Sequence, residues 1–190
     1  GGGEPTLEWP VIQKVVEHTE KIKNDKKTGY LITTNGTADV EKWDWMMAHE
    51  FSISISLDGP PDIQDRNRPV VGGEPSSKIV ETSIRYLVDH NYPLGVRVTY
   101  SPVDNIEAIL EYFAELGIKS VHLEPLFPHG RDYEEVRFGK AGGDEVYSPH
   151  GGEFALWFLK AVDKAKSLGI KVRNGHLIHF TQGIGYFCGA

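Results

Sequence analysis

Short apolar runs alternate with longer amphipathic segments along almost the whole chain. We expect strands at 30–35, 51–57, 94–100 and 120–124, with a short fifth strand at 170–173. Apolar residues at three- and four-residue spacing predict a helix in each interval, starting near positions 7, 39, 76, 104 and 154. Because connections of this length suit crossovers between parallel strands, the order predicts an α/β fold with outer helices. About four or five parallel strands would form a partial (β/α) TIM-like barrel, a whole barrel or a doubly wound sheet.

Local signals predict how the connecting segments are built. Ser76 or Ser77 is expected to cap the third helix. Asp104, with Glu107 three residues later, matches the spacing of a capping box. The segment 58–74 is polar and is expected to be a long loop. In the first helix, one apolar stripe is predicted to face the core: Val11, Ile12, Val15, Val16 and Ile22.

Each of the first four predicted strands has one polar face, although strands buried on both sides are usually apolar throughout. The polar positions are Thr33, Asn35, Ser52, Ser54, Ser56, Arg97, Thr99, Ser101, His122 and Glu124. Burying unpaired polar groups would cost about 1–3 kcal/mol each, so a polar cavity that holds a polar ligand is favoured. An internal hydrogen-bond network or a sheet with one wet face are the alternatives. Ligands of α/β folds bind at the carboxyl ends of strands, where Asn35, Ser56, Asp58 and Glu124 fall.

Composition limits the kind of protein this is. A chain of 190 residues suits one domain, and a net charge of −7 without a basic cluster argues against a nucleic-acid partner. A single cysteine, Cys188, excludes an internal disulfide, so a cytoplasmic location is the default. No apolar run approaches the roughly 20 residues that cross a bilayer, so no membrane partner is expected.

The first residues, Gly1-Gly2-Gly3-Glu4-Pro5, read as a ligand-binding turn that enters a helix. Glycines allow close backbone approach, and a carboxylate fixed at such a turn can hold an ammonium group. A glycine-rich linker is the alternative. Turns of this kind normally follow a strand, so we expect the chain to begin within a domain.

Three stretches together resemble the radical S-adenosylmethionine (SAM) enzymes. They are Gly2-Gly3-Glu4-Pro5-Thr6-Leu7, Thr34-Asn35-Gly36-Thr37, and Ser54-Ile55-Ser56-Leu57-Asp58-Gly59-Pro60 with Asn67-Arg68 downstream. The resemblance is greatest to the branch with a C-terminal auxiliary-cluster (SPASM) domain, which includes anaerobic sulfatase-maturating enzymes and peptide-modifying maturases. It implies a full-length iron–sulfur oxidoreductase that reductively cleaves SAM. The resulting 5′-deoxyadenosyl radical would abstract hydrogen from a peptide or protein, with ferredoxin or flavodoxin as electron donor.

The resemblance also implies roles for single residues. Gly2, Gly3 and Glu4 match the turn that receives the methionine amino group of SAM, and Asn35 would lie beside that turn. For Asn35, a cap of the loop before Gly36 is the alternative explanation.

The remaining positions match the other parts of the cofactor. Ser56 and Asp58 match the element that contacts its ribose or carboxylate side, and Arg68 matches the arginine that pairs with its carboxylate. The backbone around Leu123 would border adenine. An ordinary Asp-Gly-Pro turn at Asp58 and a solvated Arg68 are the alternatives.

The chain departs from the family in one respect. It lacks the Cys-x-x-x-Cys-x-x-Cys loop that holds the 4Fe-4S cluster, so the isolated fragment is expected to be inactive. We expect residues 1–187 to be the central and C-terminal part of a radical SAM core. Residues 188–190 would start a truncated SPASM domain, in which Cys188 would bind the auxiliary cluster.

Other candidates leave the catalytic acid or base unassigned. His176 and His179 have a metal-ligand spacing but read better as surface histidines. The maturases use an acidic residue near the stretch that matches 173–177, and none occurs there. Two other functions stay open: a cluster-free (β/α) enzyme acting on a phosphorylated metabolite, and a non-catalytic SAM- or nucleoside-binding module.

Overall fold

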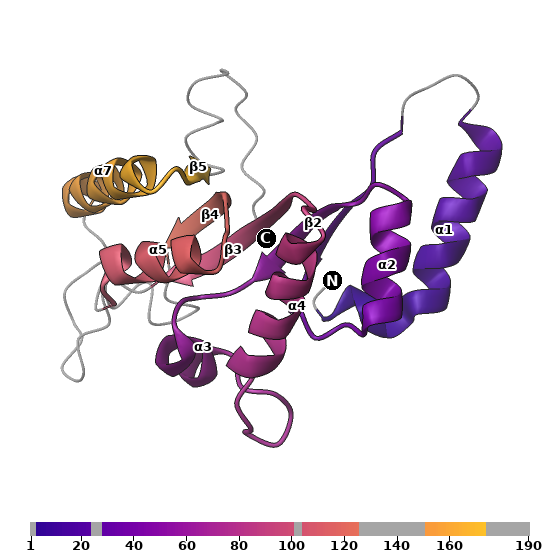
Figure 1. The fold of residues 1–190 in the computed structure, drawn as a ribbon, viewed down its shortest axis with the longest axis horizontal. Helices are drawn as coiled ribbons and strands as arrows, with labels where there is room; N and C mark the ends of the chain where they lie inside the picture. Colours follow the sequence, from indigo (N-terminus) through magenta and orange to yellow (C-terminus); the bar gives the residue numbers. More distant parts are fainter. Residues whose placement is uncertain (1–2, 24–27, 101–103, 126–150, 174–190) are drawn as a thin grey trace.

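The computed structural model describes residues 3–23, 28–100, 104–125 and 151–173, which contain one curved sheet of five parallel strands (Figure 1). The strand order follows the sequence: β1 (Leu31–Thr34), β2 (Ser52–Ser56), β3 (Leu94–Tyr100), β4 (Ser120–Pro125) and β5 (Lys171–Arg173). An order without reversal is that of a barrel segment, whereas a doubly wound sheet reverses at a switch point. The predicted partial (β/α) barrel is confirmed.

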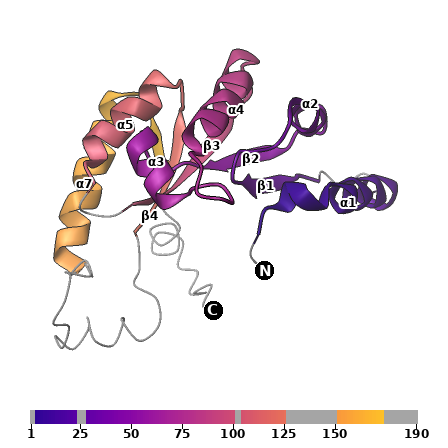
Figure 2. The ribbon, with the colours of Figure 1, turned by 90° about the horizontal axis from the view of Figure 1, so that it is seen from below.

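The helices that follow the strands line one side of the sheet. They are α2 (Val40–Ala48), α3 (Pro61–Asn67), α4 (Ser77–Asp89), α5 (Ile106–Glu115) and α7 (Gly151–Ser167). Figure 2 shows α2, α4, α5 and α7 along the same side of the curved sheet. A short 3-10 helix η1 (Pro5–Glu8) leads into α1 (Trp9–Ile22), which packs beside α2 through an edge-to-face contact of Trp9 with Trp45 at 5.1 Å. Among the described helices, none has the length and apolar character needed to traverse a bilayer.

The core lies between the helices and the apolar faces of the strands. Ile55, Val96 and Val121 are fully buried on β2, β3 and β4, and Phe113 of α5 is fully buried against them in the same apolar cluster. Burying a side chain of this size contributes roughly 1.5–3 kcal/mol. This apolar layer fixes which face of each strand turns away from the helices, and that face carries the polar residues.

Two helix starts differ from the predicted ones. Asn105, not Asp104, caps α5, and its Oδ1 accepts from the backbone N–H groups of Glu107 and Ala108. Asp104 instead pairs with Arg66. The start of α4 has no serine side-chain cap, because a carboxylate from another element supplies the acceptor.

That carboxylate is Asp65, whose Oδ1 accepts from the backbone N–H groups of Ser76 and Ser77 at 2.9 and 2.7 Å. Asp65 lies in α3, inside the segment predicted to be a long loop. The prediction of a loop over 58–74 is therefore wrong for 61–67. A proline at the first helical position favours this short helix despite its polar composition.

The stripe predicted on the first helix is only partly buried. Val16 is 2% exposed and Ile12 packs on the core, whereas Val11, Val15 and Ile22 are more than half exposed. Leu7, at the end of the same row, is 80% exposed. Part of the apolar surface of this helix therefore faces away from the described core.

Gly36, two residues after the end of β1, is expected to tolerate no side chain. Its φ is +82°, and an added Cβ would lie 2.9 Å from Cγ2 of Ile55 and 3.2 Å from Cγ1 of Val80. We expect Gly36→Ala to lower the free energy of unfolding by about 2 kcal/mol in urea titrations, from backbone strain plus overpacking. Gly73→Ala is the matched control, since its φ is +86° but no atom lies within 4 Å of the added Cβ. Equal losses in the two variants would contradict the packing argument.

Candidate functional site

The polar faces of the strands align across the sheet, as the register shows. Ser56 pairs with Arg97, Arg97 with His122, and His122 with Arg173, which makes one row from β2 to β5. Thr99 and Glu124 pair in a second row, two residues closer to the carboxyl ends of the strands. The side chains of these rows are half-buried or exposed, unlike the apolar ones on the other face. The side of the sheet that carries these two rows is therefore open to solvent, and we call it the wet face.

Glu4 joins the turn before η1 to the end of β1. Its Oε1 accepts from the backbone N–H and the hydroxyl of Thr6 at 3.0 and 2.7 Å and from the hydroxyl of Thr34 at 2.8 Å. Its Oε2 accepts from the backbone N–H of Asn35 at 2.6 Å. Burial of the Glu4 carboxylate raises its pKa, but these hydrogen bonds outweigh burial and hold the pKa below its ordinary value. Glu4 thus remains ionised and acts as a clasp: its carboxylate links the turn before η1 to the end of β1.

The neighbours of Glu4 leave polar atoms at the surface. The Oδ1 of Asn35 accepts from the backbone N–H and the hydroxyl of Thr37, which turns the chain after β1. No described residue accepts a hydrogen bond from the Asn35 amide NH₂ group. Gly3 has a φ of +127°, and no atom lies within 4 Å of the place where a Cβ would stand. Predicted residues Gly3, Glu4 and Asn35 therefore form one cluster at the end of β1.

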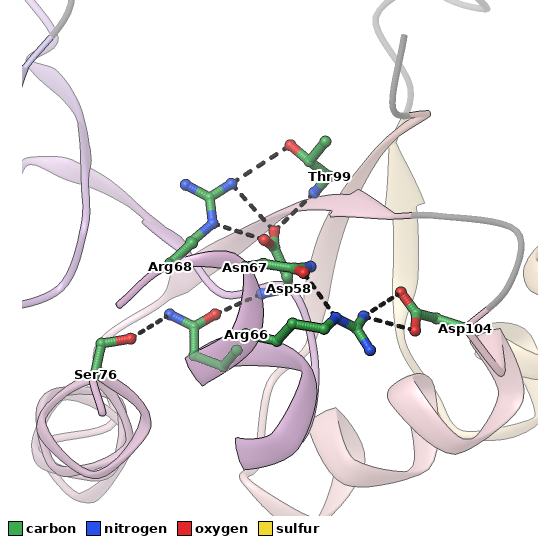
Figure 3. A network of polar contacts seen from close by, with 8 residues as sticks. Asp58, Arg66, Asn67, Arg68, Ser76, Thr99 and Asp104 are labelled. Atoms are coloured by element: carbon green, nitrogen blue, oxygen red, sulfur yellow. Dashed lines mark hydrogen bonds and ion pairs between the residues drawn. The ribbon is translucent and has the colours of Figure 1, made fainter. Parts of the chain in front are cut away.

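Asp58 and Arg68 form a second cluster, at the ends of β2 and β3 (Figure 3). The Arg68 Nε donates to Oδ2 of Asp58 at 2.8 Å and its Nη2 donates to Oδ1 at 3.1 Å. Oδ1 also accepts from the backbone N–H of Thr99 at 3.0 Å. The Asp58 side chain is 4% exposed and that of Arg68 is 35% exposed. The guanidinium is held along one edge, and no described residue bonds to its Nη1.

The buried side-chain amide of Gln64 helps to hold Asp58, and with it the Asp58–Arg68 pair, in place. The backbone N–H of Asp58 donates to Oε1 of Gln64 at 2.9 Å, and Nε2 of Gln64 donates to the hydroxyl of Ser76 at 3.2 Å. Gln64 is 1% exposed, so it is a fixed part of the frame. Gln64 was not predicted as a site residue, because the segment that carries it was predicted to be a loop. Only a prediction of the short helix would have drawn attention to Gln64, as a polar residue on the inner face of that helix.

His122 and Glu124 contact each other on the wet face of β4. The Nε2 of His122 lies 2.5 Å from Oε1 of Glu124. Both side chains are about one-quarter exposed or less. Together with Arg97 and Arg173 they make the β3–β5 part of the face strongly charged.

The other predicted residues have separate positions. Ser56 is half-buried on the wet face, one residue before the buried Leu57. The Leu123 side chain is fully buried on the apolar face, so that only its backbone lies toward the wet side. Gly2, Cys188, His176 and His179 lie outside the described residues. Within the described part of the chain, no group of three or more His, Cys, Asp or Glu residues could hold a metal ion.

The chain is similar in sequence to several curated proteins, although no protein-family model matches it. An uncharacterised protein of Methanocaldococcus jannaschii is 29% identical over 135 residues, which cover 70% of this chain and 47% of that protein. Cysteine-type anaerobic sulfatase-maturating enzymes of Clostridium perfringens and Clostridium novyi are 28% and 27% identical, and cover 70% and 85% of this chain. The matches cover only 38% and 45% of those two enzymes. The chain thus spans about half the length, or less, of the curated relatives it matches.

Solved structures share the fold of the chain. One named anSMEcpe with bound AdoMet superposes with a TM-score of 0.75 at 22% identity, over 100% of this chain and 53% of that one. A domain of the pyruvate-formate lyase-activating enzyme from Bacteroides vulgatus gives a TM-score of 0.65 at 16% identity, over 92% of this chain and 96% of that one. Streptococcus suis SuiB bound to S-adenosylmethionine gives 0.59 at 15% identity, over 91% and 36%. The predicted resemblance to radical SAM enzymes of the sulfatase-maturating branch is confirmed.

Proposed function

We propose that this chain, a relative of the anaerobic sulfatase-maturating enzymes, is the SAM-binding part of a radical SAM enzyme that modifies a peptide or protein. The observation that carries the proposal is the pair of clusters at neighbouring strand ends. Glu4 fixes a glycine turn beside β1, and Asp58 fixes Arg68 between β2 and β3. A site with an acidic turn on one side and a guanidinium on the other suits the two ends of a free amino acid, such as the methionine moiety of SAM.

The residues present fit the methionine end of the cofactor. Arg68 offers the edge that Asp58 does not occupy, with Nη1 unbonded to any described residue, to the carboxylate of SAM. Open space around Gly3 and the ionised Glu4 suit its ammonium group. Asn35 and Ser56 would contribute further hydrogen bonds, and the backbone of Leu123 would border adenine. When bound, and reductively cleaved with one electron from the iron–sulfur cluster of the full-length protein, SAM would supply a 5′-deoxyadenosyl radical for hydrogen abstraction from the substrate.

An iron–sulfur cluster does not fit this chain alone. The sequence has one cysteine, and the described residues offer no group of metal ligands. We infer that the full-length protein holds its 4Fe-4S cluster with residues that are not in this sequence. The chain's own role is then to bind and orient the cofactor.

An exposed apolar surface on η1 and α1 supports the inference that another part of the enzyme holds the cluster. Leu7, Val11, Val15 and Ile22 are each more than half exposed along η1 and α1, and β1 is the outermost strand of the described sheet. Exposed apolar rows and sheet edges are usually covered in native proteins. We propose that the part of the enzyme that holds the cluster packs on this side.

Peptide modification is proposed from two of the structural neighbours. The titles of their structures name complexes of anSMEcpe with the Cp18Cys peptide and of SuiB with the precursor peptide SuiA. A wide wet face suits such an extended substrate better than a small metabolite. An anaerobic iron–sulfide reconstitution tests the enzyme assignment. A chain extended at its N-terminus should gain cluster absorbance, whereas this chain should not.

Calorimetry with SAM tests the site itself. We expect the chain to bind SAM and Arg68→Ala to bind it roughly tenfold or more weakly, the effect of one lost charge-assisted contact. Arg66→Ala is the matched control, because this neighbouring arginine pairs with Asp104 and its side chain is 54% exposed. It should bind SAM as the wild type does. No heat with SAM for the wild-type chain, or equal losses in both variants, would contradict the proposal.

A further inference from the structure

The row that crosses the middle of the wet face contains two arginines. Arg97 on β3 and Arg173 on β5 both pair with His122 on β4, one on each side. Paired residues of parallel strands point to the same face, and neighbouring strands lie about 4.8 Å apart. The side chains of Arg97 and Arg173 therefore leave the sheet on either side of His122, and Ser56 of β2 continues the row.

These two arginines lack the partners that the arginines of α3 and its C-terminal end have. Arg66 and Arg68 each pair with an aspartate, Asp104 and Asp58. The side chains of Arg97 and Arg173 are exposed, and neither guanidinium group makes a hydrogen bond or an ion pair with another described residue. His122 cannot accept a hydrogen bond from either arginine through its Nε2, since that atom contacts Glu124.

The sign of this row is opposite to that of the chain. The whole chain carries a net charge of −7. Along the row, two permanent cations stand beside a histidine, and Lys171 lies two residues before Arg173 on the same strand face. Like charges on one face repel each other, and an anion bound between them would relieve that repulsion.

We propose that Arg97, His122 and Arg173 bind a carboxylate of the peptide substrate. The planar fork of arginine matches a carboxylate in two parallel hydrogen bonds, and arginines on both sides of His122 can approach it from two directions. This inference rests on the proposed function, in which the wet face receives a peptide. It adds the substrate class: a peptide with an acidic residue near the modified position.

The carboxylate of SAM is the other source of the same chemistry, and its expected place is elsewhere. The two clusters assigned to the methionine end lie at β1 and between β2 and β3. The arginine row extends from β3 to β5 and lies two residues, about 6–7 Å, below the strand-end row of Thr99 and Glu124. The substrate therefore accounts for this row better than the cofactor does.

Peptide titrations followed by NMR test the proposal on this chain. The probes are acetyl-Glu-Glu-Glu-amide and its matched neutral analogue, acetyl-Gln-Gln-Gln-amide. We expect the glutamate peptide alone to shift the Nε–Hε signals of Arg97 and Arg173. Arg97→Gln should weaken its binding by roughly tenfold, in line with one charge-assisted contact. Arg85→Gln is the control. It changes an exposed arginine on α4, on the helix side of the sheet, and should leave binding unchanged.

Three further measurements separate the outcomes. SAM affinity should be unchanged in Arg97→Gln, and a loss there would assign the row to the cofactor and overturn the proposal. Equal binding of both peptides, or tighter binding of inorganic phosphate than of the glutamate peptide, would also overturn it. Arg68→Ala should lose SAM and keep the glutamate peptide. If the wild-type chain binds the glutamate peptide through this row but not SAM, the proposed function fails while the anion site stands.

Discussion

Replacing Asp58 with alanine is expected to lower the free energy of unfolding by about 3 kcal/mol, near the lower end of the range for breaking a buried ion pair. The carboxylate is 4% exposed and accepts three hydrogen bonds, two from Arg68 and one from the backbone of Thr99. Without it, the Thr99 N–H loses its partner and Arg68 loses its fixed edge. The loss stays at the lower end because Arg68 is 35% exposed and water can solvate its charge.

Urea unfolding of Asp58→Ala and Asp62→Ala measures this effect. Asp62 is exposed on the first turn of α3 and bonds to no described residue, so its replacement should change stability by less than about 0.5 kcal/mol. The double variant Asp58→Ala/Arg68→Ala should be less destabilised than the sum of the single variants, since the two residues share one interaction. Additive losses, or a loss below about 1 kcal/mol for Asp58→Ala, would show that the pair does not hold the site together.

The sheet could be predicted because its signal is local. Along β2, serines at positions 52, 54 and 56 alternate with buried Ile53 and Ile55, and this period of two is visible without any tertiary information. The polar strand faces and their exposure to a wet side followed from the same pattern. The order of the strands in the sheet could be predicted less directly. Alternating strands and helices are compatible both with a sequential strand order and with one that reverses within the sheet.

Contacts between distant segments could not be predicted in the same way. Asp65 caps α4 from eleven and twelve residues away, so the nearby serines were the wrong candidates. Asp58 and Arg68 were each assigned to the cofactor, but their mutual pairing depends on α3 turning the chain back over ten residues. Motifs thus identified residues that gather at the strand ends, and only the fold shows which of them hold each other.

Replacing Glu4 with glutamine is expected to cost about 2 kcal/mol of stability at pH 7, comparable to one or two lost hydrogen bonds to a charged group. The isosteric amide can still offer an oxygen to Thr6 and Thr34. Its NH₂ group would then face the backbone N–H of Asn35, which donates to Oε2 at 2.6 Å in the wild type. Two donors in contact would push the glycine turn away from the end of β1.

The pH dependence of this difference has a definite sign. The pKa of Glu4 in the folded chain lies below its ordinary value of 4.5, because four hydrogen bonds outweigh burial. Its contribution to stability is therefore complete above about pH 5 and is lost as the pH falls through the folded pKa. The stability difference between wild type and Glu4→Gln should shrink from about 2 kcal/mol at pH 7 toward zero at a pH below the folded pKa of Glu4, where both side chains are neutral.

Two control variants decide whether Glu4 acts as a clasp. Glu8→Gln changes an exposed glutamate at the end of η1 and should match the wild type at both pH values. Thr34→Val removes a hydroxyl that donates to Oε1 at 2.8 Å and keeps the carboxylate. If Glu4 holds the turn in place, Thr34→Val should weaken SAM binding together with stability, although Thr34 itself is 2% exposed and faces the core. Unchanged SAM affinity in Thr34→Val, with a loss in Glu4→Gln, would instead make the carboxylate a direct ligand of the ammonium group.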